Sequence, residues 1–250
     1  MTGSSVKGRR ALLQAALNGA RRRDEHPALP VTSLELAEAA AQAVAVGAMA
    51  IHVHVRDTRG MESLAGEDVA RALGALRTTI PGIPLGLSTG AWILPDTERR
   101  HRTVAAWAAQ PDFASVNFDE PGAELLAALL LTKGVGVEAG VCTVGAADRL
   151  ARSGLASRCL RALLEPQAQE LPTALETVRE IESTLTSGAV MLPRLLHGVD
   201  HTAWPLIAEA AARGYGTRVG FEDTLTLPDG SMAESNAILV QAACRVLAGR

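Results

Sequence analysis

The sequence predicts an α/β protein with the architecture of a (β/α)8 TIM barrel, formed by one catalytic domain over residues 1–250. Short β-rich runs alternate along the chain with longer amphipathic segments rich in Ala and Leu, which is typical of consecutive βα units around a parallel sheet. Eight such pairs with short connections favour a closed barrel. The chain lacks a G-x-G-x-x-G motif after its first strand and a phosphate-binding loop, so nothing favours an open dinucleotide-binding sheet.

Each element is expected where its pattern is clearest. We expect buried strands at residues 12–17, 50–55, 85–88, 113–117, 136–141, 159–164, 190–196 and 217–221. Helices should follow them at residues 33–46, 67–79, 96–109, 122–133, 146–153, 172–184, 201–213 and 233–247. Ser33, Asp96 and Asp200 stand where an N-cap residue belongs, immediately before or at the start of a helix.

Composition narrows the classes of partner. The 24 Lys and Arg residues against 27 Asp and Glu residues leave a net charge of −3, so we expect no nucleic-acid partner. Because no uninterrupted apolar stretch approaches the ~20 residues of a membrane helix, we expect no membrane span either. A hydrophobic share of 48% supplies enough apolar material for one large core.

Cysteine usage and the first residues indicate a cytoplasmic protein. Cys142, Cys159 and Cys244 are odd in number and widely spaced, which argues against a disulfide framework and against a thiolate zinc site. Basic residues before the apolar run 11–17 imitate a secretion signal; they are Lys7, Arg9 and Arg10. That run is too short for a signal and charged residues follow it at once, so we interpret it as the first strand.

The strongest candidate site is a pair of histidines in the second expected strand. His52 and His54 are separated by one residue, so both side chains lie on the same side of the strand and can reach one ion. We therefore interpret this pair as metal ligands rather than as structural histidines. Arg56 and Asp57 follow, either as part of the site or as a strand-end ion pair without catalytic meaning.

Two adjacent carboxylates end the last expected strand. Glu222 and Asp223 must point to opposite sides, one to a metal and the other elsewhere. Arg218 precedes Glu222 by four residues and lies on the same alternating face at a deeper level. The alternative is a structural one, in which Asp223 caps a helix and Arg218 forms a buried ion pair with Glu222.

Other strand ends carry weaker signals. The third strand ends in small residues followed by Gly, a turn whose N–H groups could hold a carboxylate: Ser88, Thr89, Gly90 and Ala91. Further polar candidates lie at plausible depths in the barrel: Asn18, Arg21, Asn117, Glu120 and Glu138. The remaining histidines are interpreted as loop, cap or surface residues: His26, His101, His197 and His201.

The motifs, in their order along the chain, resemble those of the β-keto acid cleavage enzymes. The resemblance is carried by the segments Asn18-Gly19-Ala20, Pro27-Ala28-Leu29-Pro30-Val31-Thr32, His52-Val53-His54-Val55-Arg56-Asp57, Ser88-Thr89-Gly90, Arg218-Val219-Gly220-Phe221-Glu222-Asp223 and Ser235-Asn236-Ala237. Ala91 and Thr224 stand where the family commonly has Gly and Asn, and the middle of the chain is less similar.

The resemblance implies a zinc ion bound by His52, His54 and Glu222. It also implies a reaction in which a β-keto acid and acetyl-CoA are converted to acetoacetate and a new acyl-CoA, with the metal stabilising the enolate of the keto acid. Asp223, polarised by Arg218 and Ser88, is then the candidate proton relay. The remaining positions follow the same comparison, with Glu138 matching an active-site glutamate and a homo-oligomer, often a tetramer, as the usual assembly.

Two other functions remain open at this point. An amidohydrolase-type metal-dependent hydrolase also uses His-x-His on a barrel strand, but further histidines are expected on its fifth and sixth strands. A barrel that binds a keto acid or a metal without turnover is the non-enzymatic alternative. Arg21 bears on substrate choice because the founding family member has an acidic residue there, so a basic one favours an anionic or uncharged β-keto acid, most sharply a keto-diacid. The alternatives are that Arg21, Arg22 and Arg23 form a solvated loop or that they bind the phosphates of CoA.

Overall fold

The computed structural model describes residues 11–249, in which strands and helices alternate along the chain. The strands are β1 (Leu13–Ala16), β2 (Ala50–Val53), β3 (Leu85–Ser88), β4 (Phe113–Asn117), β5 (Gly136–Val141), β6 (Arg161–Leu164), β7 (Arg194–Leu196) and β8 (Thr217–Val219). The helices are α1 (Ser33–Ala45), α2 (Gly66–Thr79), α3 (Thr97–Ala105), α4 (Ala123–Thr132), α5 (Val144–Arg152), α6 (Leu171–Ser187), α7 (Ala203–Arg213) and α8 (Asn236–Leu247), with short 3-10 helices at Ala156–Arg158 and Asp200–Thr202. Lys7, Arg9 and Arg10 lie outside the described residues.

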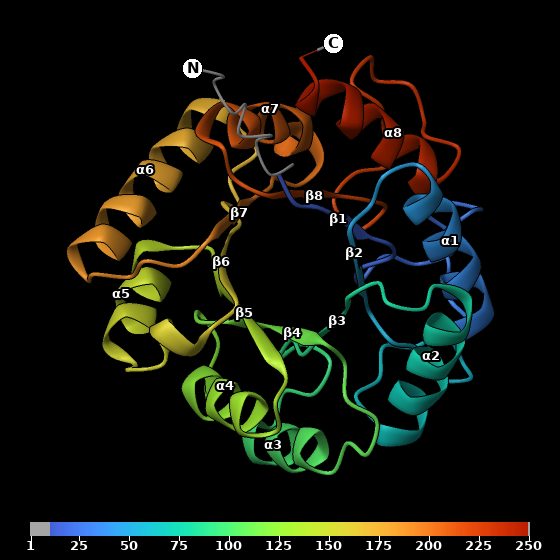
Figure 1. The fold of residues 1–250 in the computed structure, drawn as a ribbon, viewed down its shortest axis with the longest axis horizontal. Helices are drawn as coiled ribbons and strands as arrows, with labels where there is room; N and C mark the ends of the chain where they lie inside the picture. The colour runs from blue at the N-terminus through green and yellow to red at the C-terminus, as the bar shows by residue number, and fades with distance from the viewer. Residues whose placement is uncertain (1–10, 250) are drawn as a thin grey trace, which may run out of the picture.

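The strands form one parallel eight-stranded sheet that curls into a barrel. Each strand pairs with the next in chain order, and β1 also pairs with β8. A parallel bridge between Leu195 and Gly216 joins β7 to β8, where the N–H of Leu196 donates to the carbonyl of Gly216 at 2.9 Å. Figure 1 shows the strands around the centre and the helices outside them. The predicted (β/α)8 barrel is confirmed.

Two of the three expected N-cap residues are wrong. Asp96 caps α3, accepting the N–H of Arg99. The N-cap of α1 is Thr32 rather than Ser33, because Thr32 and Glu35 form a capping box. Asp200 caps no helix; it lies in a 3-10 turn before α7 with a positive φ of 48°, and its carboxylate binds Arg21 instead.

Several element boundaries differ from the expected ranges by a few residues, and three of them have local reasons. Strand β7 begins at Arg194 rather than at residue 190, and Pro193 before it has no N–H to donate. Helix α3 ends at Ala105 rather than at residue 109, and the buried Trp107 beyond it donates its indole N–H to the carbonyl of Leu64. Helix α8 starts at residue 236 rather than 233, after its N-cap Ser235.

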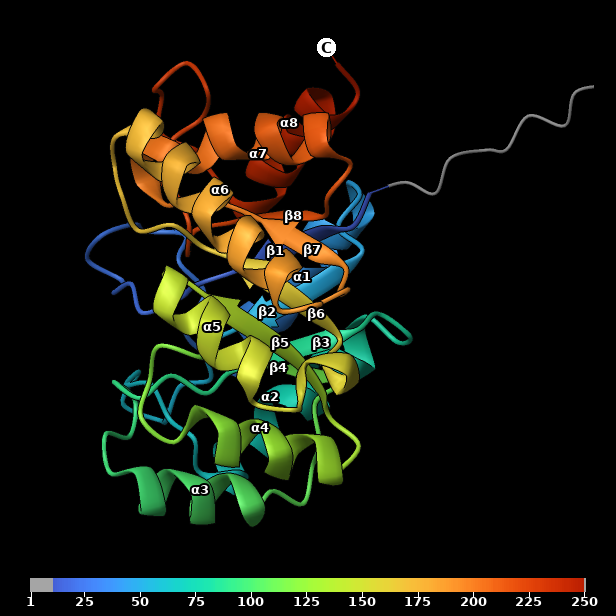
Figure 2. The ribbon, with the colours of Figure 1, turned by 90° about the vertical axis from the view of Figure 1, so that its left-hand side faces the viewer.

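The barrel places the carboxyl ends of all eight strands at one end. Strand residues are buried on both faces, since one face packs inside the barrel and the other against the outer helices. Figure 2 shows α5 and α6 in front of the strands, with α3 and α8 at opposite sides. No helix within residues 11–249 is long and apolar enough to cross a membrane.

Candidate metal centre and barrel-mouth cavity

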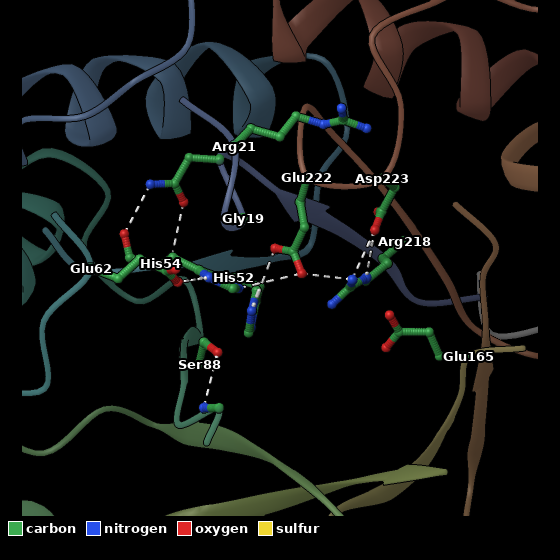
Figure 3. Close-up of polar contacts among 12 residues, drawn as sticks. Gly19, Arg21, His52, His54, Glu62, Ser88, Glu165, Arg218, Glu222 and Asp223 are labelled. Carbon is green, nitrogen blue, oxygen red and sulfur yellow. Dashed lines mark hydrogen bonds and ion pairs between the residues drawn. The ribbon is translucent and has the colours of Figure 1, made fainter. Parts of the chain in front are cut away.

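Two histidines and a glutamate meet at the carboxyl ends of β2 and β8. Nε2 of His52 lies 3.6 Å from Oε2 of Glu222, and Nε2 of His54 lies 3.5 Å from Oε1 of the same residue. One ligand atom from each residue falls within 4.8 Å of the other two. Figure 3 shows Glu222 between the histidines and Arg218. The predicted donor set is therefore brought together in a geometry that can hold one cation.

Glycines let Glu222 approach the histidines. Gly19, after β1, has a φ of 55°, and a Cβ at this position would lie 2.5 Å from Cγ of Glu222. A Cβ on Gly220 would lie 2.0 Å from the carbonyl oxygen of Ala16. Because both approaches are too short for any larger residue, these glycines bring the β8 loop against β1.

The two histidines differ in the protonation state that their surroundings favour. Burial lowers the pKa of His52 to about 3, so this imidazole is neutral, the form that binds a metal. Burial lowers the pKa of His54 as well, but the carboxylates of Glu222 and Glu62 outweigh it and raise the pKa to about 9. The carboxylates therefore demand a positive charge beside them, which either a proton or a metal cation supplies.

Two loops orient the His54 ring. Nδ1 of His54 lies 2.6 Å from Oε1 of Glu62, which leaves Nε2 facing Glu222. Trp92 donates its indole N–H to both oxygens of Glu62, at 3.1 and 3.3 Å, and its ring stacks on His54 with centroids 6.0 Å apart. A carboxylate behind a ligand histidine is the usual outer support of a metal site.

Asn18 and Arg56 fix the backbone around the histidines. The side chain of Asn18 donates to the carbonyl of His54 and accepts its N–H, each at 2.9 Å. Arg56 donates to the carbonyls of Gly19 and Arg21. Asp57 pairs with Arg59 rather than with Arg56, so the alternative of an Arg56–Asp57 ion pair is not formed.

Arg218 joins the two adjacent carboxylates. Its Nη2 lies 2.7 Å from Oε1 of Glu222 and 2.8 Å from Oδ1 of Asp223. Oδ2 of Asp223 is buried and has no hydrogen-bond partner within the described part of the chain. Asp223 caps no helix, so of the expected structural roles only the buried Arg218–Glu222 ion pair is present.

Behind Asp223 lies a buried histidine between two carboxylates. Nδ1 of His197 is 3.4 Å from Oδ1 of Asp223, and Nε2 is 3.3 Å from Oε2 of Glu165. Burial and Arg218 lower the pKa of His197, but the two carboxylates outweigh them and raise it to about 9. Burial raises the pKa of Glu165, whereas His197 lowers it to about 2. Both shifts favour the charged forms of His197 and Glu165 at neutral pH, although Arg218 Nε also donates to Nδ1 of His197 at 3.3 Å.

These groups line a cavity of about 550 Å³ at the barrel mouth, which we call the barrel-mouth cavity. It contains eight of the side chains predicted from the sequence: Arg21, His52, His54, Ser88, Asn117, Arg218, Glu222 and Asp223. The wall opposite the histidines adds residues from the ends of β5 and β6: Cys142, Glu165 and Gln167.

A sequence model of the β-keto acid cleavage enzymes matches residues 10–250. The chain belongs to the β-keto acid cleavage enzyme family. It is 29% identical over 255 residues to the 3-keto-5-aminohexanoate cleavage enzyme of Fusobacterium nucleatum subsp. nucleatum, covering 94% of this chain and 90% of that protein. It is 26% identical to the enzyme of the same name from Acetoanaerobium sticklandii, with the same coverage.

Solved structures agree with the barrel fold. The ternary complex of ObcA with a C4-CoA adduct and oxalate superposes with a TM-score of 0.73 at 17% identity, covering 90% of this chain and 64% of that one. The chain thus spans less than two thirds of ObcA. Tryptophan synthase subunit alpha from Legionella pneumophila gives a TM-score of 0.59 at 12% identity, covering 96% and 94% of the two chains. These likenesses bear on the fold alone.

Six of the predicted site residues of this family member do not line the barrel-mouth cavity: Asn18, Thr89, Gly90, Ala91, Glu120 and Glu138. The turn after β3 does hold a carboxylate as expected, but the carboxylate is the chain's own, because the N–H of Ala91 donates to Glu120 at 2.9 Å. Thr89 donates its hydroxyl to the carbonyl of Ser115. The turn is therefore satisfied without a substrate.

Glu138 occupies the barrel interior near the start of β5. It accepts from the amide of Gln14 at 3.0 Å and pairs with Arg161 at the first position of β6. Its exposed fraction is 0%. The structure therefore supports a role for Glu138 in barrel packing rather than in the barrel-mouth cavity.

Sequence reasoning missed several groups at the site. His197 lies in the loop after β7 but is fully buried rather than at the surface, and His26, also in a loop, is buried with its ring against Phe221. Glu165 and His197 immediately follow β6 and β7. In TIM barrels the active site lies at the carboxyl ends of the strands, and the same reasoning that singled out Glu222 would have singled out both residues. Glu62 carries no comparable signal, because it lies in a loop eight residues after His54.

Proposed function

We propose that this protein is a zinc-dependent β-keto acid cleavage enzyme that exchanges the acyl groups of a β-keto acid and acetyl-CoA, releasing acetoacetate and a new acyl-CoA. The observation that carries the proposal is the convergence of the His52, His54 and Glu222 ligand atoms within 4.8 Å, next to a carboxylate with a free oxygen in the same cavity. Membership of the family supports the reaction class.

The donor set fits zinc. Two imidazole nitrogens and one carboxylate are a common catalytic zinc set, and three protein ligands leave positions open for substrate. Oε2 of Glu222 is buried without a hydrogen-bond partner within residues 11–249, as expected of an oxygen that faces a cation. When bound, zinc would act as a Lewis acid that stabilises negative charge on the keto and carboxylate oxygens of the substrate.

Asp223 is the proposed base for the proton on C2 of the keto acid. Its Oδ1 is held by Arg218 and His197, which leaves Oδ2 to accept the proton. Ser88 lies in the same cavity, where its hydroxyl can orient the substrate. The C2 carbanion then attacks the acetyl thioester and expels the CoA thiolate. Attack of that thiolate on the original keto carbon breaks the C2–C3 bond and gives the new thioester, and Asp223 returns its proton to C2, giving acetoacetate.

The positions of the histidines argue against the amidohydrolase alternative. Strands β5 and β6 contain no histidine, and the barrel-mouth cavity is lined by no histidine other than His52 and His54 in the described chain. The single cluster of three donors found within residues 11–249 suits one ion. The non-catalytic alternative predicts zinc binding without turnover, so it is decided by experiment.

The deciding experiment incubates zinc-loaded protein with acetyl-CoA and a panel of β-keto acids bearing a terminal carboxylate, methyl or amine. Acetoacetate should accumulate with at least one acid, in equal amount to the new acyl-CoA. The control is the double variant His52→Ala/His54→Ala, which should lose both zinc, by elemental analysis, and turnover. Zinc binding by the wild type without acetoacetate from any acid would leave a binding protein.

We also propose a cytoplasmic homo-oligomer. The three free cysteines support a reducing compartment, and the resemblance to the family supports a tetramer. Sedimentation velocity of the purified chain should give a species of four subunits, and a monomer at micromolar concentration would contradict that assembly.

A further inference from the structure

A second cavity lies beside the barrel-mouth cavity and is rich in arginine. It measures about 680 Å³, and its wall includes Arg21, Arg22, Arg23, Arg56 and Arg59; we call it the arginine cleft. Only two carboxylates, Asp24 and Glu62, join them in its lining. Ala20, Arg21 and Trp92 line both cavities, so the two are neighbours across a shared wall.

Arg56 gives the arginine cleft a buried cation. Its exposed fraction is 8%, and it forms no ion pair within the described chain. Its guanidinium donates to the carbonyls of Gly19 and Arg21, and its Nε has no partner there. The carboxylates of Glu62 and Glu222 offset its burial only partly, since the pKa of Arg56 is still lowered, so an anion in the cleft would stabilise this residue.

Arg22 and Arg59 are the arginines most available to a ligand. Their side chains are 81% and 82% exposed, and each pairs with a nearby carboxylate, Asp24 at 3.4 Å and Asp57 at 3.1 Å. Such exposed pairs contribute little, so a phosphate with several acceptor oxygens can replace the carboxylate. Arg23, by contrast, is held by both oxygens of Glu35.

Trp92 separates the two cavities and presents an apolar surface. Its side chain is half exposed, and its indole N–H is fixed by Glu62. A ligand that spans the two cavities would therefore carry anionic groups at one end, an uncharged arm in the middle and a reactive group at the other end. A CoA thioester has this distribution, with phosphates at one end, the pantetheine arm in the middle and the acyl group at the other.

We propose that the arginine cleft binds the phosphate groups of the CoA thioester, with Arg22 and Arg59 contacting phosphate oxygens and the pantetheine arm passing Trp92 into the barrel-mouth cavity. The proposal rests on the proposed function for the identity of the ligand. The location of the phosphate site can be tested independently of the reaction, because a nucleotide that contains no thioester should bind there too.

The binding experiment titrates the zinc-loaded protein with CoA, with adenosine 3′,5′-bisphosphate and with inorganic phosphate. The double variant Arg22→Ala/Arg59→Ala should bind the first two at least about tenfold more weakly, as expected for the loss of charge-assisted hydrogen bonds. Arg152→Ala is the matched control, since Arg152 is 77% exposed, pairs with Asp148 on α5 and lines neither cavity. It should bind as the wild type does.

Three binding results would overturn the location: equal affinity of the double variant and the wild type for CoA, the same loss in Arg152→Ala, or inorganic phosphate binding as tightly as the nucleotide. The last would indicate a general anion site rather than one for CoA. A protein that binds the bisphosphate through these arginines but makes no acetoacetate would retain the cleft and reject the proposed reaction.

The kinetic experiment compares acetyl-CoA with the acetyl thioester of N-acetylcysteamine, which has no phosphate. With acetyl-CoA, the double variant should show a KM raised by at least about tenfold and an unchanged kcat, because only ground-state binding is removed. With the short thioester, the double variant and the wild type should have equal kcat/KM. An equal loss on both thioesters would place the effect in the barrel-mouth cavity and overturn the proposal.

Discussion

Asp223 and Glu222 are neighbours in sequence but differ in what their oxygens contact. Glu222 faces both histidines, whereas Asp223 faces Arg218 and His197 and keeps Oδ2 free. We expect Asp223→Asn to retain zinc and to lower turnover by about 10²–10⁴-fold, because the amide keeps the shape but cannot accept the C2 proton. Exchange of the C2 proton without acetyl-CoA, followed by NMR, should fall with turnover. Unchanged exchange would leave Asp223 a structural role.

A substitution at Glu62 tests whether the carboxylate behind His54 supports metal binding. Its carboxylate fixes Nδ1 of His54 at 2.6 Å, so Glu62→Gln weakens that contact without removing a ligand. We expect zinc affinity to fall by about 10–100-fold, measured by competition with a chelator. Glu67→Gln, in the first turn of α2, is the control. Equal zinc affinity in Glu62→Gln and the wild type would mean that Trp92 and the backbone suffice to orient the ring.

Arg21 bears on substrate charge. It lines the barrel-mouth cavity, but its guanidinium also pairs with Asp200 at 2.6 Å and Glu25 at 3.3 Å. We expect Arg21→Glu to lower kcat/KM for a keto acid with a terminal carboxylate and to raise it for one with a terminal amine. Equal loss with acids ending in carboxylate, methyl or amine would instead indicate CoA binding. No change would mean that the two carboxylates occupy Arg21 fully.

At the scale of single residues, sequence reasoning succeeded where one local rule was enough. His52 and Arg218 lie on strands and His54 directly follows one, so alternation fixes the side of each of these side chains, whereas Glu222 joins them from the turn after β8. Glu138 shows the limit, because depth along the strand decides between cavity and interior and depends on strand register. Glu120 shows another, since a turn able to hold a carboxylate does not reveal which carboxylate will fill it.

At the scale of elements, the alternating pattern predicted the order and type of the eight strands and eight α-helices found in residues 11–249. The boundaries depended on features that periodicity does not contain, such as the capping box that moves the start of α1 to Thr32. The loops after the strands were the least predictable, because Glu62 and Trp92 lie far apart in sequence and meet only through the packing of neighbouring strands β2 and β3.

The loop after β1 is an element whose backbone shapes the metal centre. Gly19 has a φ of 55°, and a Cβ there would lie 2.5 Å from Cγ of Glu222. We expect Gly19→Ala to displace Glu222 and to weaken zinc binding by about tenfold or more. Gly82→Ala is the matched control, because Gly82 has a φ of 80° but no atom within 4 Å of the added Cβ.

Both glycine variants should lose about 1–2 kcal/mol of stability from the strained backbone. Only Gly19→Ala should lose zinc affinity, measured by chelator competition on protein shown to be folded by circular dichroism. Similar zinc affinities in the two variants would mean that the loop adjusts without moving Glu222, and would contradict the argument from close approach.

At the scale of the whole molecule, closure of the barrel depends on few backbone contacts between β7 and β8. The two strands meet through the bridge between Leu195 and Gly216. Beyond their ends, His197 after β7 lies between Glu165 after β6 and Asp223 after β8. These side chains span the seam, so their ionisation should affect the free energy of unfolding of the entire barrel.

The pKa of His197 sets the pH range of this contribution. It is raised to about 9 in the folded protein, so the stabilisation is fully present below the unfolded value of about 6.5 and is lost as the pH rises through 9. The pKa of Glu165 is lowered to about 2, so its contribution is present above about 4.5 and is lost as the pH falls toward 2. The ion pair should therefore stabilise the barrel most between these limits, from about pH 4.5 to 6.5.

We expect His197→Gln to be destabilising near pH 6 and the difference from the wild type to shrink as the pH approaches 9. Urea unfolding of the zinc-loaded proteins from pH 5 to 9.5 measures it, with His101→Gln on α3 as the control. A constant difference across this range would mean that packing of the ring, rather than its charge, stabilises the seam. A difference that grows toward pH 9 would show that His197 is neutral in the folded barrel, because a neutral buried histidine stabilises only above its unfolded pKa.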